Sequence, residues 1–121
     1  MANELTIVGA ISFTKGSSGP IGFDTITKTL DVTGTDYTKQ TQLITTSEVA
    51  LDLGAAIGTP GYAFIRNLDA TNFVSYRGAT GGANAIKIKP GEFALFRLGT
   101  STPFMIADTA SVQVEYLIVE A

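Results

Sequence analysis

Apolar and polar residues alternate in short runs along most of this chain, and this period of two restricts the fold more than any other feature. The apolar side chains of residues 4–14 share one parity, with threonine and serine on the other: Leu5, Ile7, Ile11 and Phe13. Successive side chains of a strand point to opposite faces, so the pattern is typical of a strand with one buried face. Most runs end at Gly, Pro, Asn or Asp, which favour turns.

Further strands are expected over about 21–33, 62–66, 73–77, 85–89, 92–98 and 111–120. Residues 34–42 are polar and are interpreted as a turn, residues 15–20 as a flexible loop, and the stretch around Pro103 as another loop. In residues 47–58, Ser47 could cap a helix while alternating Val49, Leu51 and Leu53 favour a strand. A strand is preferred, because Gly54 follows too soon for a stable helix.

The stretch GYAFIRNLDATNFVSY, residues 61–76, is interpreted as a β-hairpin with a connection of four to six residues. Asn67, Asp69 and Asn72 offer oxygen ligands at short spacing, but a turn stabilised by Asx side chains is preferred over a calcium site. Pro90-Gly91 suits the centre of a type II turn.

This pattern predicts an all-β protein with eight or nine short strands, arranged as one antiparallel β-sandwich or jelly roll over residues 1–121. At 121 residues and 45% hydrophobic residues, the chain is long enough for one core. Residues 1–14 are proposed as an N-terminal arm strand that reaches a neighbouring subunit, because the Gly-Ser loop after them would let the strand pair elsewhere.

The sequence contains no histidine and no cysteine, which excludes Ser-His-Asp and Cys-His catalysis, disulfides and thiolate zinc sites. Five lysines lie in predicted loops or on polar strand faces, where burial would not lower the pKa of a catalytic base: Lys15, Lys28, Lys39, Lys87 and Lys89. GATGGANAIK does not match a phosphate loop. We expect no catalytic residues, cofactor or metal.

A net charge of −3 and scattered basic residues argue against nucleic-acid binding. No apolar run is long enough to span a membrane, and the start of the chain does not resemble a signal peptide. We therefore expect a soluble protein with neither nucleic acid nor membrane as a partner.

Aromatic side chains near an arginine suggest an interface, because tyrosine and arginine are enriched at binding hot spots. The alternative is that Phe73 and Tyr76 only pack the two faces of the hairpin. Residues 92–98 carry apolar side chains on both parities, which predicts burial on both faces or at a subunit contact. The candidate interface residues are Leu5, Ile7, Tyr62, Phe73, Tyr76, Arg77, Phe93 and Phe96.

The stretch PGYAFIRNLDATNFVSYRGATGGANAIKIKPGEFALFRL, residues 60–98, and the opening ANELTIVGAISFTKG resemble small virion structural proteins of tailed bacteriophages. The resemblance implies a β-sandwich that decorates or cements the capsid, as a homo-oligomer such as a trimer. The implied partner is the major capsid protein, and the implied location is the capsid surface of the virion after synthesis in the host cytoplasm. A tail, baseplate or connector component and a glycan-binding virion module are the alternatives.

Overall fold

The structure, a computed structural model, describes residues 4–16, 19–32, 34–55 and 57–120. These residues form ten strands and no helix, all paired antiparallel, which confirms the all-β prediction. The chain divides into two compact units, Met1–Thr33 and Gly34–Ala121, and each is described by itself.

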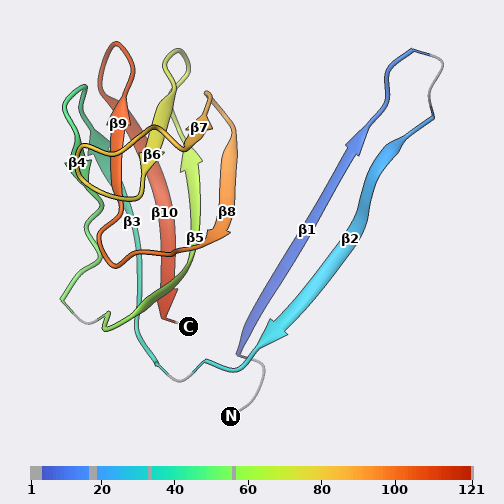
Figure 1. Ribbon diagram of the computed structural model, residues 1–121, viewed down its shortest axis with the longest axis horizontal. Helices are drawn as coiled ribbons and strands as arrows, with labels where there is room; N and C mark the ends of the chain where they lie inside the picture. The colour runs from blue at the N-terminus through green and yellow to red at the C-terminus, as the bar shows by residue number, and fades with distance from the viewer. Residues whose placement is uncertain (1–3, 17–18, 33, 56, 121) are drawn as a thin grey trace. The chain divides into compact units, whose positions relative to one another are not determined.

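The first unit is a two-stranded antiparallel hairpin of β1 (Leu5–Phe13) and β2 (Ile21–Leu30). Figure 1 shows both strands in blue, and the register runs from Leu5 opposite Leu30 to Phe13 opposite Ile21. The strands expected at 4–14 and about 21–33 are confirmed, although Thr33 lies outside the described residues. In this structure the proposed arm strand is one half of the hairpin; residues 1–3 of the arm are not described, and its reach to a neighbour stays a prediction.

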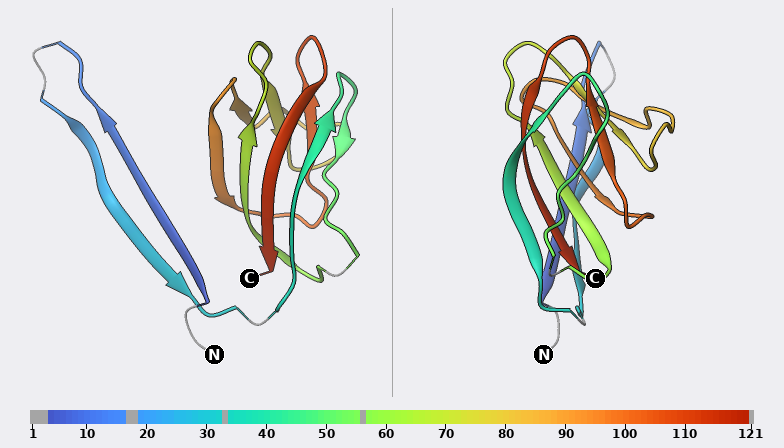
Figure 2. Two further views of the ribbon diagram at one scale, coloured as in Figure 1. Left: turned by 180° about the vertical axis from the view of Figure 1, so that it is seen from behind. Right: turned by 90° about the vertical axis from the view of Figure 1, so that its left-hand side faces the viewer.

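The second unit is a β-sandwich of two four-stranded sheets, seen from three sides in Figures 1 and 2. The first sheet has the order β3-β10-β5-β8, and the second has the order β4-β9-β6-β7. The first contains β3 (Tyr37–Ile44), β10 (Val112–Glu120), β5 (Pro60–Asn67) and β8 (Phe93–Arg97). The second contains β4 (Val49–Ala50), β9 (Phe104–Ala107), β6 (Val74–Arg77) and β7 (Ile86–Ile88). The predicted β-sandwich is confirmed for the second unit, but it does not extend over residues 1–121, because β1 and β2 form a separate hairpin. A jelly-roll connection stays a prediction.

The core lies between the two sheets and follows the period of two. In β10 every second side chain is buried. In β5, Ala63, Ile65 and Asn67 are buried, and the alternate side chains Tyr62, Phe64 and Arg66 point outward. The largest buried core side chains are Tyr116, Ile44, Ile65, Ile88, Met105 and Ile118. Across the core, the rings of Tyr76 and Phe96 meet edge to face with centroids 4.9 Å apart.

The predicted hairpin of residues 61–76 is wrong. β5 pairs with β10 and β8, whereas β6 pairs with β9 and β7, so residues 68–73 cross from one sheet to the other. The prediction that alternate side chains of residues 62–67 point to opposite faces is confirmed, since Ala63 and Ile65 are buried while Arg66 is exposed. Alternation indicates which face of a strand is buried but not which strand it pairs with.

The predicted turn at residues 34–42 is also wrong, because residues 37–42 belong to β3. Three polar side chains of β3 bond the neighbouring segment: Thr38 donates to the Leu53 carbonyl, and Gln40 donates to the Asp52 carbonyl at 3.1 Å. Gln42 donates to the Ala50 carbonyl at 2.9 Å and accepts from the Asp52 N–H at 3.0 Å. Residues 50–53 are therefore bonded to β3 through side chains. The strand expected within residues 47–58 is limited to β4, Val49–Ala50.

The strand expected at residues 92–98 is β8, Phe93–Arg97, and it lies at the edge of its sheet rather than buried on both faces. Phe93 is 64% exposed, while Ala94 and Phe96 are half-buried on the core side. The loop expected around Pro103 contains the short strand β9, which the sequence analysis missed. The turn before β8 is as expected: the Glu92 N–H donates to the Lys89 carbonyl at 2.9 Å, and Gly91 has φ of 77°.

Candidate functional site

The hairpin carries its large apolar side chains on one face. Paired residues of antiparallel strands project to the same side of the sheet, so the register places a set of apolar residues together. We call this the apolar hairpin face: Leu5, Ile7, Ile11, Phe13, Ile21, Phe23, Ile26 and Leu30. The opposite face carries mostly threonine and serine, with Val8 the largest apolar side chain among the described strand residues.

A β-bulge keeps the apolar hairpin face continuous. Gly9 pairs with Ile26 and Ile11 pairs with Phe23. Between these two pairs, β1 has one residue and β2 has two, so β2 contains one extra residue. The extra residue in β2 reverses its parity, and the odd positions 21 and 23 therefore share a face with the even positions 26, 28 and 30. Without the bulge, the apolar residues of β2 would divide between the two faces.

The apolar hairpin face is largely open to solvent in the chain described. Ile11 is 65% exposed, Phe23 is 67% exposed and Ile26 is 56% exposed, while Leu5 and Ile7 are half-buried. An isolated two-stranded hairpin is only marginally stable in water, and large contiguous exposed apolar surfaces in folded proteins mark interaction sites. This face is the strongest candidate for a binding surface in the first unit.

The sandwich presents a second apolar surface on the outside of the sheet β3-β10-β5-β8. The registers align outward side chains in rows across the four strands, including Tyr37–Val119–Tyr62–Arg97 and Lys39–Leu117–Phe64–Leu95. We call this the outer sheet face; its apolar members are Tyr37, Leu43, Tyr62, Phe64, Phe93, Leu95, Leu117 and Val119. Tyr37 is 65% exposed and Leu43 is 53% exposed.

Aromatic and charged contacts arrange the outer sheet face locally. The rings of Phe64 and Phe93 stack with centroids 5.2 Å apart and an interplanar angle of 7°. The Arg97 guanidinium lies 4.5 Å from the centroid of Tyr62, a cation-π contact. Arg66 and Glu115 form an exposed ion pair at 3.4 Å, which contributes little to stability.

The structure places the sequence-predicted interface residues in five different surroundings. Leu5 and Ile7 lie on the apolar hairpin face, and Tyr62 and Phe93 lie on the outer sheet face. Tyr76 and Phe96 contact each other in the sandwich core, and burial raises the pKa of the Tyr76 hydroxyl. Phe73 packs beneath the Lys87 ammonium, whose Nζ lies 4.1 Å from the ring centroid. The remaining candidate, Arg77, belongs to a polar cluster around Glu48.

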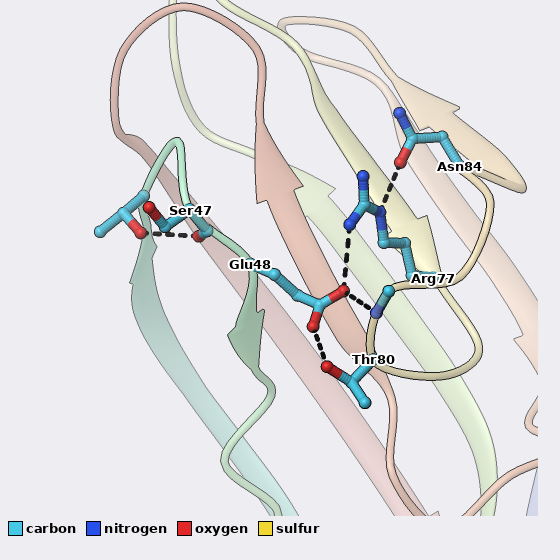
Figure 3. Close-up of polar contacts among 7 residues, drawn as sticks. Ser47, Glu48, Arg77, Thr80 and Asn84 are labelled. Atoms are coloured by element: carbon cyan, nitrogen blue, oxygen red, sulfur yellow. Dashed lines mark hydrogen bonds and ion pairs between the residues drawn. The ribbon is translucent and has the colours of Figure 1, made fainter.

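Glu48 anchors the loop between β6 and β7, as Figure 3 shows. Its carboxylate accepts a hydrogen bond from the Thr80 hydroxyl, one from the Gly81 N–H at 2.8 Å, and one from Arg77 Nη1 at 3.0 Å. Arg77 Nε also donates to Asn84 Oδ1 at 2.7 Å. The bonds from Thr80 and Gly81, with a smaller contribution from Arg77, lower the pKa of the Glu48 carboxyl. These three bonds join Glu48, which precedes β4, to the end of β6 and to the loop after it, so we interpret the cluster as structural.

The residues considered for calcium instead organise the crossing between sheets. Asp69 accepts hydrogen bonds from the N–H groups of Asn72 and Thr71 at 2.7 and 2.9 Å, which lower the pKa of its carboxyl. Asn67 is buried and donates to the Asn72 and Ile88 carbonyls, at 3.0 Å each. These contacts agree with the Asx-stabilised turn, although not with its placement in a hairpin.

Sequence reasoning missed most of the apolar hairpin face and the role of Glu48. The parity of Leu5, Ile7, Ile11 and Phe13 in β1 was recognised, but in β2 only the even positions were grouped. Ile21 and Phe23 also alternate, and a change of parity within one run is the signal that a bulge can leave. No sequence signal was found for Glu48.

In comparisons with protein-family models, curated proteins and solved structures, no match to this chain was found. Within the described ranges, no group of three or more His, Cys, Asp and Glu side chains is placed to hold a metal ion. Across the same part of the chain, no helix is long and apolar enough to cross a membrane.

Proposed function

We propose that this protein is a structural component of a tailed-bacteriophage virion, and that it acts as a capsid decoration or cement protein. The observation that carries the proposal is the apolar hairpin face, because eight large apolar side chains share one side of a hairpin that carries no second layer of its own strands. A surface of this kind serves assembly, since it becomes stable when a partner covers it. The proposed role is structural and not catalytic.

The resemblance of residues 60–98 and of the opening residues to phage virion proteins supports the assignment to a virion. The proposed partner is the major capsid protein, and the proposed state is a homo-oligomer such as a trimer on the outer surface of the capsid. Burial of apolar area stabilises by roughly 25 cal/mol per Å². Repeated over many lattice positions, such contacts would stabilise a shell, because multivalent attachment makes modest single contacts sufficient.

Addition of the purified protein to capsids that lack it tests this proposal. We expect saturable binding and a higher temperature of capsid disruption. The Ile11→Ser variant should bind more weakly, because it removes an exposed side chain of the apolar hairpin face, on which assembly of the capsid-bound homo-oligomer depends. Val8→Ser is the matched control, since Val8 is 52% exposed on the opposite face of the same strand. Absence of binding by the unmodified protein would contradict the proposal.

A further inference from the structure

We propose that the apolar hairpin face of one copy packs on the outer sheet face of a second copy. This inference rests on the homo-oligomer within the proposed function and identifies the contact that would hold it together. The two surfaces belong to the same chain, so an assembly always contains them in equal number. Among the described residues, neither surface is covered by strands of its own unit.

The two surfaces have matching dimensions. The hairpin strands contain nine and ten residues, and the central strands of the outer sheet face, β10 and β5, contain nine and eight. At about 3.3 Å per residue and about 4.8 Å between strands, each pair makes a face roughly 30 Å long and 10 Å wide. Two such faces can stack as layers of a sandwich, with apolar side chains interdigitating between them.

One hairpin-to-sheet contact is small, which favours assemblies in which every copy both gives and receives a hairpin. A face of this size is small beside the roughly 800 Å² per partner of a stable interface. In a reciprocal dimer, two copies exchange hairpins with each other. In a closed ring, each copy contributes its hairpin to one neighbour and receives a hairpin from the other. Every copy then forms two such contacts, and no apolar hairpin face is left exposed.

The two surfaces offer one pair of opposite charges. Within the paired strand residues of the apolar hairpin face, the charged member is Lys28, opposite Ile7. Among the outward residues of the four strands of the sheet, the acidic member is Glu115, and the basic members are Lys39, Arg66 and Arg97. Glu115 makes a 3.4 Å exposed contact with Arg66. An approach of Lys28 to Glu115, away from the basic residues, would set how the two faces align.

Cross-linking tests the contact directly, because the chain contains no cysteine that would give background. One copy carries Phe23→Cys on the apolar hairpin face, and a second copy with a longer affinity tag carries Leu117→Cys on the outer sheet face. The two are co-expressed, purified through the longer tag and treated with a short bismaleimide. The control replaces Phe23→Cys with Val8→Cys on the opposite face of the hairpin.

We expect a covalent heterodimer of the Phe23→Cys and Leu117→Cys copies, formed several-fold more than in the Val8→Cys control. Ile26→Cys supplies a second position on the apolar hairpin face, and circular dichroism with thermal melting verifies that each variant retains the sandwich. If both hairpin positions gave no more heterodimer than the control, the inference would be overturned.

Two further results separate this inference from the proposed function. Light scattering that found the unmodified protein monomeric at all accessible concentrations would contradict the homo-oligomer and, with it, the inference. An oligomer that forms without hairpin-to-sheet cross-links would overturn the inference alone. A single chain carrying both Phe23→Cys and Leu117→Cys that cross-linked only within itself would show that the hairpin covers its own sheet, which also overturns the inference.

Discussion

Glu48 illustrates how one carboxylate can order a loop that has few apolar contacts. Donors from Thr80, Gly81 and Arg77 surround it, and they favour its charged form. Glu120 acts in a similar way at the other end of the sandwich, where it accepts from the Gly58 N–H at 2.7 Å and the Asp36 N–H at 3.1 Å. These bonds lower the pKa of the Glu120 carboxyl.

Stability should therefore fall in acid. The folded pKa of Glu48 lies below its ordinary value of 4.5, so between these two values the unfolded chain binds a proton that the folded chain does not. The contribution is fully present above pH 4.5 and is lost as the pH falls through the folded pKa. The free energy of unfolding is measured by urea denaturation from about pH 7 to about pH 3. It should fall less steeply in acid for Glu48→Gln than for the unmodified protein.

The matched control for this titration is Glu92→Gln, since Glu92 accepts one exposed hydrogen bond, from the Lys89 N–H. Some acid sensitivity should remain in the Glu48→Gln variant, because the pKa values of Asp69 and Glu120 are also lowered. An acid limb equally steep in the Glu48→Gln variant and the unmodified protein would contradict this account of Glu48.

Asn67→Ala should destabilise the sandwich through lost hydrogen bonds. The buried Asn67 amide donates to the Ile88 and Asn72 carbonyls, and its oxygen accepts from the Asp69 N–H at 2.7 Å. Loss of a buried partner costs about 1–3 kcal/mol, so we expect the free energy of unfolding to fall by about that amount in chemical denaturation. Asn84→Ala removes one exposed bond and should change it by about 0.5 kcal/mol. Equal effects of the two substitutions would be evidence against this role.

At the scale of elements, the hairpin depends on a close backbone approach at Gly22. A Cβ added at Gly22 would lie 1.9 Å from the Ile11 carbonyl oxygen. Gly22→Ala should therefore disrupt the pairing around Ile11 while leaving all apolar side chains of the hairpin in place. Sedimentation should show self-association weakened about tenfold or more, equivalent to about 1.4 kcal/mol, with the melting of the sandwich unchanged.

The control for Gly22 is Gly19→Ala, because a Cβ at Gly19 would meet no atom within 4 Å. Gly19→Ala should self-associate like the unmodified protein. If Gly22→Ala assembled equally well, the proposed assembly role of the hairpin would be in error.

Most strands could be predicted from alternation, because each carries its apolar side chains mainly on one face. The partners of the strands could not, as β5 and β6 show: their parity was correct, and yet they lie in different sheets. β3 was missed because its inward side chains include Thr38, Gln40 and Gln42, whose hydrogen bonds to residues 50–53 are long-range contacts without a local pattern.

The candidate surfaces were predicted only in part for the same physical reason. Leu5 and Ile7 were identified because β1 has a regular period, whereas the bulge in β2 hides the alignment of Phe23 with Ile26. Tyr62 and Phe93 were proposed from residue type and lie on the outer sheet face. Tyr76 was proposed on the same ground and is in the core, because residue type alone does not distinguish a core aromatic from an interface aromatic.

At the scale of the whole molecule, the chain contains a sandwich with its own core and a hairpin with an exposed apolar face. The sandwich has its own core between two sheets, while the hairpin is a single two-stranded sheet. Figures 1 and 2 show the strands of both units. A division of this kind suits a repeated subunit, in which one part supplies stability and the other supplies contacts.

Quantitative mass spectrometry of purified virions tests the central claim most directly. It gives the copy number of this chain relative to the major capsid protein. For a decoration protein we expect a ratio near one, or another large fraction of the lattice positions. A few to a few dozen copies would place the chain in the tail or connector, and its absence from the particle would contradict a structural role in the virion.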